Sequence, residues 1–200
     1  MRHPGRLSAE WIDGRRARWS SPLRLYLLTA ALFFTVLGLT DRAGGGSPSV
    51  ITDAATGFVA GALSSGESAL SDPEAAAAVA EGMELLPPAF LFLVPLGAGL
   101  LGRVLASRDR QFVEHLITLV HVHAFAFLVW VPVPAVRLFT SFDVGGLVTL
   151  TIVWYIHRAF RTVYGSLPMR LWVGVAVVGL VYMTSIAIAL GLIGVARATG

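Results

Sequence analysis

Three histidines and a glutamate fall within ten residues of an otherwise apolar stretch. Glu114, His115, His121 and His123 interrupt the apolar segment 112–131. Ionisable groups are costly inside a segment of this kind, so they usually face a protein interior, a water-filled cavity or a cofactor. Imidazoles and carboxylates can ligate metal ions or haem iron, and imidazoles exchange protons near neutral pH. This stretch is therefore the main candidate for a functional site.

Helical geometry limits what these four side chains can do by themselves. Glu114 and His121 project within ~20° of each other but lie two turns apart, and His121 and His123 point to nearly opposite sides. No pair has the i, i+3 or i, i+4 spacing with which one helix grips one ion. The spacing argues against a closed metal site within this helix. A metal ion or haem would need a ligand from another helix.

The composition indicates that these residues are carried by a polytopic membrane protein. Of 200 residues, 56% are hydrophobic and only 14% are charged, and the mean hydropathy is +0.74. A soluble domain of this length needs more polar surface. Spans need roughly 17–25 mostly apolar residues, and we expect five within a membrane domain 22–200. Their bounds are about 23–39, 85–105, 112–131, 145–160 and 169–195.

The arginines predict one orientation for the five spans. All fifteen basic residues are Arg. Twelve fall in the N-terminal segment or in the loops after the second and fourth spans, and three fall on the other side. The positive-inside rule then places the N-terminus in the cytoplasm. This sorting explains the high pI, so we expect no nucleic-acid partner.

Two segments are expected outside the bilayer. Residues 1–21 resemble an amphipathic cytoplasmic lead-in with Ser8 as the cap of a short helix, lying on the lipid surface. Residues 40–84 form an acidic external loop. The first span follows a basic segment but no A-x-A cleavage site, so we interpret it as an uncleaved anchor rather than a signal peptide.

This topology predicts that the polar side chains gather in the cytoplasmic half of the bundle. His157 lies at the cytoplasmic end of the fourth span, at the depth of Glu114, and Tyr26 lies early in the first span. The predicted cluster, which is also the candidate ligand-binding set, comprises Tyr26, Glu114, His115, His121, His123, His157, Arg158 and Tyr164.

Three interpretations of this cluster remain open. In the first, the groups are structural and pair across helices. In the second, they hold a cofactor or ion, such as haem between histidines of two helices or a carboxylate–histidine metal site. In the third, they bind a quinone, a lipid or another small molecule, or they exchange protons.

Four stretches resemble an uncharacterised family of bacterial inner-membrane proteins, domain of unknown function 3667. They are the segment from Trp11 to Tyr26, the pair Phe33-Phe34, the core from Phe112 to Phe125, and His157-Arg158 with Val163-Tyr164-Gly165. Many members of the family begin with a cysteine-bearing zinc ribbon. This chain has no cysteine, so no zinc-ribbon function is implied. The resemblance implies an inner-membrane protein and supplies no reaction, substrate or cofactor.

We therefore expect an all-α, five-span protein of the bacterial inner membrane. The chain carries no recognisable catalytic motif. We expect a non-enzymatic component or accessory subunit of a membrane complex, whose partners are the lipid bilayer and other membrane subunits. The alternative is a binding protein for haem, a metal ion, quinone or lipid at the Glu/His cluster.

Overall fold

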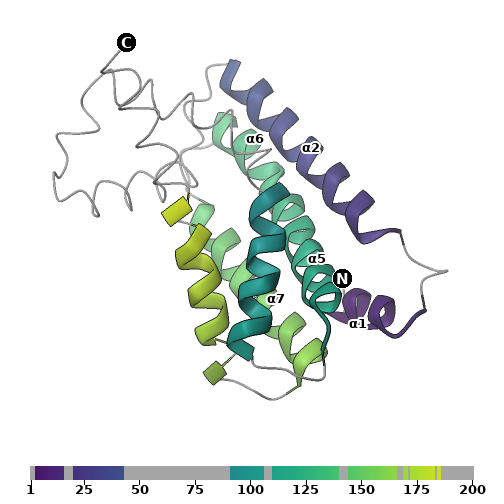
Figure 1. Cartoon of the computed structure of the whole chain (residues 1–200). Helices are drawn as coiled ribbons and strands as arrows, with labels where there is room; N and C mark the ends of the chain where they lie inside the picture. The colour runs from purple at the N-terminus through teal and green to yellow at the C-terminus, as the bar shows by residue number, and fades with distance from the viewer. Residues whose placement is uncertain are drawn as a thin grey trace, which may run out of the picture.

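The chain is all-α over the residues that the computed structural model describes. These are residues 3–15, 20–42, 91–105, 110–139, 144–165, 169–170, 172–182 and 184–185. The external loop expected at 40–84 lies almost entirely outside them, as do 85–90 of the second expected span and 186–195 of the fifth. The described elements form a bundle of helices with a short helix packed against one end (Figure 1).

Two helices are long and apolar enough, by length and composition, to cross a membrane. They are α2 (Pro22–Arg42) and α5 (Phe112–Trp130), whose apolar stretches, Pro22–Thr40 and Phe112–Trp130, have 19 residues each. Leu91–Leu105 and Trp172–Tyr182 form shorter apolar helices in the described part of the chain. Another long helix, α7 (Gly145–Tyr164), carries His157, Arg158 and Arg161 near its end.

Ring and glycine contacts show that two pairs of neighbouring helices run antiparallel. On α5 and α7, His115 lies against Tyr164, and Phe125 stacks on Tyr155 with centroids 3.6 Å apart. Residue numbers that increase along α5 therefore meet residue numbers that decrease along α7, so these two helices are antiparallel. Helices Leu91–Leu105 and Trp172–Tyr182 are antiparallel too, because Leu101 contacts Gly174 and Gly97 contacts Tyr182.

Helix α5 ends at Trp130, directly before Pro132 and Pro134. A single turn residue, Val131, separates it from helix α6 (Pro132–Phe139), which was not expected from the sequence. Pro132 occupies the first position of α6, where its missing N–H removes no intrahelical hydrogen bond. The prolines thus separate two helices that follow one another, and α6 packs against both α2 and α5.

An aromatic cluster joins α2 to α5. The Phe127 ring lies 5.4 Å from Phe33 and 5.9 Å from Tyr26, and all three side chains are buried. Aromatic pairs of this geometry contribute about 0.5–1.5 kcal/mol each beyond the area they bury. These contacts hold α2 against Phe127, while the start of α2 shares a hollow with Val113 and Leu116 in the first half of α5.

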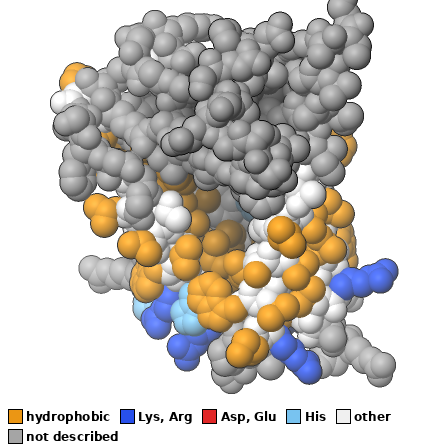
Figure 2. Space-filling model, turned by 90° about the vertical axis from the view of Figure 1, so that its left-hand side faces the viewer, with side chains coloured by type: hydrophobic (Ala, Val, Ile, Leu, Met, Phe, Trp, Pro, Cys, Tyr) orange, Lys and Arg blue, Asp and Glu red, His pale blue; other side chains and the backbone are white. Residues whose placement is uncertain are grey.

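The outer faces of the long helices are apolar and exposed. Only 17% of the apolar stretch of α2 is buried, and Leu28, Leu150 and Trp154 are each more than half exposed. Figure 2 shows hydrophobic side chains over the middle of one face, with Arg and His side chains near its lower rim. This distribution is the one expected where lipid, rather than water, covers the middle of a bundle.

Helix α1 (Arg6–Ile12) was expected to lie on a lipid surface, with Ser8 as its cap. The cap position is instead held by Gly5, in the left-handed conformation with φ 82°, and Ser8 is a buried residue of the helix interior. Helix α1 packs against both α5 and α7 (Figure 1). A Cβ on Gly5 would lie 2.6 Å from the carbonyl oxygen of Ala159, so glycine is what permits this close approach.

Candidate functional site

Glu114, His115 and Tyr164 belong to one hydrogen-bonded group where α5 begins and α7 ends. His115 Nδ1 lies 2.9 Å from the Tyr164 hydroxyl, which also hydrogen bonds with the side chain of Thr118. Arg110 donates to Glu114 at 3.2 Å and to the carbonyl oxygen of Val163 at 2.5 Å. The group ties the first turns of α5 to the last turn of α7.

The ring of His115 also reaches a third helix. A Cβ on Gly102 would lie 3.0 Å from His115 Cδ2 and 3.3 Å from Nε2. Only a residue without a side chain lets helix Leu91–Leu105 approach the imidazole this closely. His115 is 2% exposed, so both faces of the ring are enclosed by protein. The imidazole therefore joins three helices.

His121 is enclosed by α1 instead. Its Nδ1 lies 2.9 Å from Ser8 Oγ, and the two side chains are 3% and 2% exposed. Nε2 of His121 is buried and has no hydrogen-bond partner among the described residues. Two further contacts hold α1 here. The Thr162 hydroxyl donates to the carbonyl oxygen of Pro4 at 3.0 Å, and the Tyr155 hydroxyl hydrogen bonds with the backbone of Gly5.

His123 points to another side of α5, as its spacing from His121 requires. Its Nδ1 donates to the carbonyl oxygen of Leu119, 2.8 Å away on the same helix. Its ring centroid lies 5.6 Å from that of Tyr182. The Tyr182 hydroxyl is buried without a hydrogen-bond partner in the described part of the chain, and it is the atom nearest a Cβ built on Gly97.

His157 and Arg158 of α7 lie apart from these groups. The His157 ring stacks on Trp172 with centroids 5.5 Å apart, and its buried Nδ1 has no partner among the residues described. Arg158 is exposed, and its carbonyl oxygen accepts from Thr162 at 2.9 Å. His157 thus contacts the fifth expected span rather than α5.

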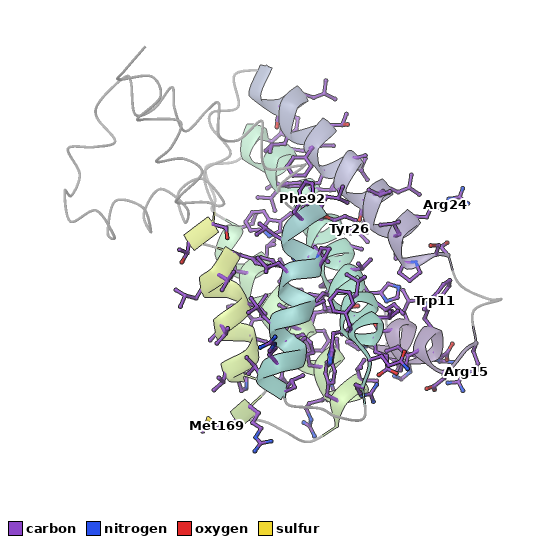
Figure 3. All side chains as sticks on the ribbon, in the orientation of Figure 1. Trp11, Arg15, Arg24, Tyr26, Phe92 and Met169 are labelled. Atoms are coloured by element: carbon purple, nitrogen blue, oxygen red, sulfur yellow. The ribbon has the colours of Figure 1, made fainter. Side chains whose placement is uncertain are left out.

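Tyr26 lines two apolar hollows beside α2. One, of about 390 Å³, lies between Trp11, the start of α2, helix Leu91–Leu105 and α5. The other, of about 490 Å³, runs along α2 past Leu27, Ala31 and Phe34. Tyr26 and Leu91 border both. Figure 3 shows Tyr26 on the inner side of α2 and Arg24 projecting outward from the helix.

The eight predicted residues therefore occupy six places. Glu114, His115 and Tyr164 share one hydrogen-bonded group, whereas His121, His123, His157 and Tyr26 each have different neighbours, and Arg158 faces outward. The described residues contain no group of three or more His, Cys, Asp or Glu side chains placed to hold a metal ion. Within that part of the chain, each imidazole packs against a different helix or ring.

Sequence reasoning missed the residues that contact the histidines. Ser8 was expected to cap α1, and Thr118, Tyr155 and Tyr182 were not singled out. No local signal marks them, because each pairs with a residue far away in the sequence. Arg110 was counted only for its charge, yet its spacing of four from Glu114 is a detectable helix-pair signal.

Comparison with known proteins gives one partial match. A family model described as protein of unknown function (DUF3667) matches residues 1–34. The matched region covers α1 and the first half of α2, which supply Ser8, Trp11 and Tyr26. No curated protein and no solved structure matches the chain.

Proposed function

We propose that the chain is a multi-pass protein of the bacterial inner membrane, with five spans and a cytoplasmic N-terminus. Support comes from the two long apolar helices and from the exposed apolar faces of α2 and α7. Further support comes from two antiparallel helix pairs, α5 with α7 and Leu91–Leu105 with Trp172–Tyr182. The charged side chains of Arg110, Glu114 and Arg161 lie at the same end of the bundle as α1. In the proposed topology this end faces the cytoplasm, which is the side where the positive-inside rule expects most of the Arg residues.

Within the membrane, we propose a non-enzymatic component or accessory subunit of a membrane complex. The observation that carries this proposal is the use of the candidate polar groups as helix contacts. His115 pairs with Tyr164, Glu114 with Arg110, and His121 with Ser8. Groups used in this way lower the cost of polar atoms in a bundle and fix the helix register.

The test is purification of the whole chain from native membranes in a mild detergent. The proposal expects a complex of fixed stoichiometry that co-migrates through size exclusion, with no Soret band and no stoichiometric metal. A Soret band or bound metal that disappears in His121→Ala or His123→Ala would contradict it. A monodisperse chain without any partner, extracted at several detergent strengths, would contradict the subunit proposal as well.

A second candidate function is ligand binding, and one observation favours it. Nε2 of His121 is buried and has no hydrogen-bond partner among the described residues, and such an atom costs free energy unless something pairs with it. This nitrogen would coordinate haem iron or a metal ion, or it would donate a hydrogen bond to the head group of a quinone. The absorption spectrum and metal analysis described above separate this candidate from the first.

A further inference from the structure

The two hollows beside Tyr26 adjoin one another along α2 and together are named the α2 groove. Tyr26 and Leu91 border both of them, so the lining runs from Trp11 past Tyr26 to Phe34. The two parts measure about 390 and 490 Å³. Each lies within the range of ordinary small-molecule sites, ~300–1,000 Å³.

The part of the groove that runs along α2 past Leu27, Ala31 and Phe34 suits a flexible hydrocarbon chain. Its lining is apolar apart from the hydroxyls of Tyr26 and Thr35. Ala30 and Ala31 lie side by side on α2 and leave the space that larger side chains would fill. An elongated apolar groove with few polar groups offers an acyl chain contact along its length but offers a compact polar ligand little to bind.

Arg24 follows Leu23, a residue of the groove lining, and has no acidic partner in the described part of the chain, although it lines neither hollow itself. Arg24 is exposed and lies one turn before Leu27, in the helical row that continues to Ala31 and Thr35. Of the other described arginines, Arg6 pairs with Glu10, Arg15 with Asp13 and Arg110 with Glu114, whereas Arg158 and Arg161, like Arg24, have no acidic partner among the described residues.

Trp11 lines the same end of the groove as Leu23. Tryptophan is enriched at the depth of lipid headgroups, where its ring meets both the apolar and the wet layer. The apolar row therefore begins at a cation and an interfacial aromatic ring. This order of groups matches the order within a phospholipid, whose charged phosphate is followed by its acyl chains.

We propose that this groove binds one acyl chain of an anionic phospholipid, whose phosphate pairs with the guanidinium of Arg24. The proposal rests on the membrane location proposed above. It goes further in naming one site, one lipid class and the residues that select it. Ala31 and Phe34 contact the chain, and Arg24 favours an anionic over a zwitterionic headgroup.

The experiment reconstitutes the full chain in phosphatidylcholine vesicles that contain a minor fraction of photoactivatable phosphatidylglycerol. After illumination, mass spectrometry of peptides measures the labelling of α2. Ala31→Trp fills the groove, and Leu32→Trp is its matched control, because Leu32 is exposed and projects ~140° from Leu27. Arg24→Gln removes the charge, with Arg158→Gln as the control on exposed α7.

The proposal expects Ala31→Trp to abolish most labelling of the groove row, while Leu32→Trp leaves it unchanged. Arg24→Gln should reduce labelling about fivefold, the effect of one basic side chain near an anionic surface. The same probe with a phosphocholine head should label wild type as weakly as the Arg24→Gln variant. If Ala31→Trp fails to fold, the Arg24→Gln comparison still decides between the outcomes.

Two results would overturn the proposal. Equal labelling of all faces of α2, insensitive to Ala31→Trp, would mean contact with bulk lipid only. Equal labelling by the two headgroups, insensitive to Arg24→Gln, would remove the selection of anionic lipid. Release of the protein from native membranes by alkaline carbonate would instead contradict the membrane location, so the two failures are distinguishable.

Discussion

Ser8 Oγ and His121 Nδ1 lie 2.9 Å apart, both buried, across 113 positions of sequence. Their contact places α1 against α5 seven positions beyond Glu114, roughly 10 Å along the helix. Helix α1 is therefore part of the bundle rather than a surface attachment. It encloses a histidine that the sequence marks as a candidate for chemistry.

The Ser8–His121 contact predicts measurable coupling between two distant residues. Ser8→Ala leaves Nδ1 of His121 buried without its partner, so we expect a loss of about 1 kcal/mol in the free energy of unfolding. In a double-mutant cycle with His121→Leu, the two losses should be less than additive. Unfolding in detergent measures each variant. Strict additivity would show that the two side chains do not interact.

Gly5 and Gly14 form a matched pair for testing how α1 is seated. Both have positive φ, 82° and 83°, but a Cβ on Gly5 would collide with Ala159 whereas one on Gly14 would meet nothing within 4 Å. Both alanine variants carry the left-handed backbone cost of about 1–2 kcal/mol. We expect Gly5→Ala to lose more stability and to expose the N-terminal segment to protease. Equal effects of the two substitutions would contradict the packing of α1 on α7.

Tyr164 should matter more than the ion pair beside it. Its hydroxyl pairs with His115 and Thr118, whereas the side chains of Arg110 and Glu114 are 31% and 26% exposed. Tyr164→Phe leaves the His115 imidazole short of a partner, so we expect it to cost about 1–2 kcal/mol. Glu114→Gln removes a partly solvated pair, with an expected cost below about 1 kcal/mol. Thermal unfolding of the two variants ranks them, and the reverse order would contradict this description.

Gly97 and Tyr182 predict a substitution that can be rescued. A Cβ on Gly97 would lie 2.5 Å from the Tyr182 hydroxyl, whereas one on Gly99 would meet only a Phe112 carbon at 3.9 Å. Gly97→Ala should destabilise the bundle by about 1–3 kcal/mol, as overpacking does, and Gly99→Ala should be nearly neutral. Tyr182→Phe removes the colliding oxygen and should recover part of the loss. Failure of that rescue would place the clash elsewhere.

The sequence predicted an all-α chain and its long apolar helices, which the structure confirms, because hydrophobic length is a local property. The five-span topology stays a prediction. The contacts of the candidate residues were less predictable. The prediction grouped Tyr26 with Glu114 in the cytoplasmic half of the bundle but named no neighbour for its ring, which in the structure lies against Phe127, on which Phe33 also stacks. Contacts between helices depend on tertiary packing and leave no local pattern.

The packing of α1 against the bundle was not predicted, for a related reason. Its Arg and Trp residues are typical of an interfacial helix. What distinguishes a docked helix here is Gly5 against Ala159 and Ser8 against His121, two pairings between residues far apart in the sequence. Once the fold is known, the small residue at position 5 explains the approach, but the sequence does not indicate which helix it faces.

The central claim is a multi-pass membrane protein with its N-terminus in the cytoplasm, and accessibility of single cysteines tests it most directly. The chain has no cysteine, so Gly46→Cys and Ser107→Cys each introduce a unique thiol. A membrane-impermeant maleimide should label the Gly46→Cys variant only in right-side-out vesicles and the Ser107→Cys variant only in inside-out vesicles. Labelling of both variants from the same side would contradict the account.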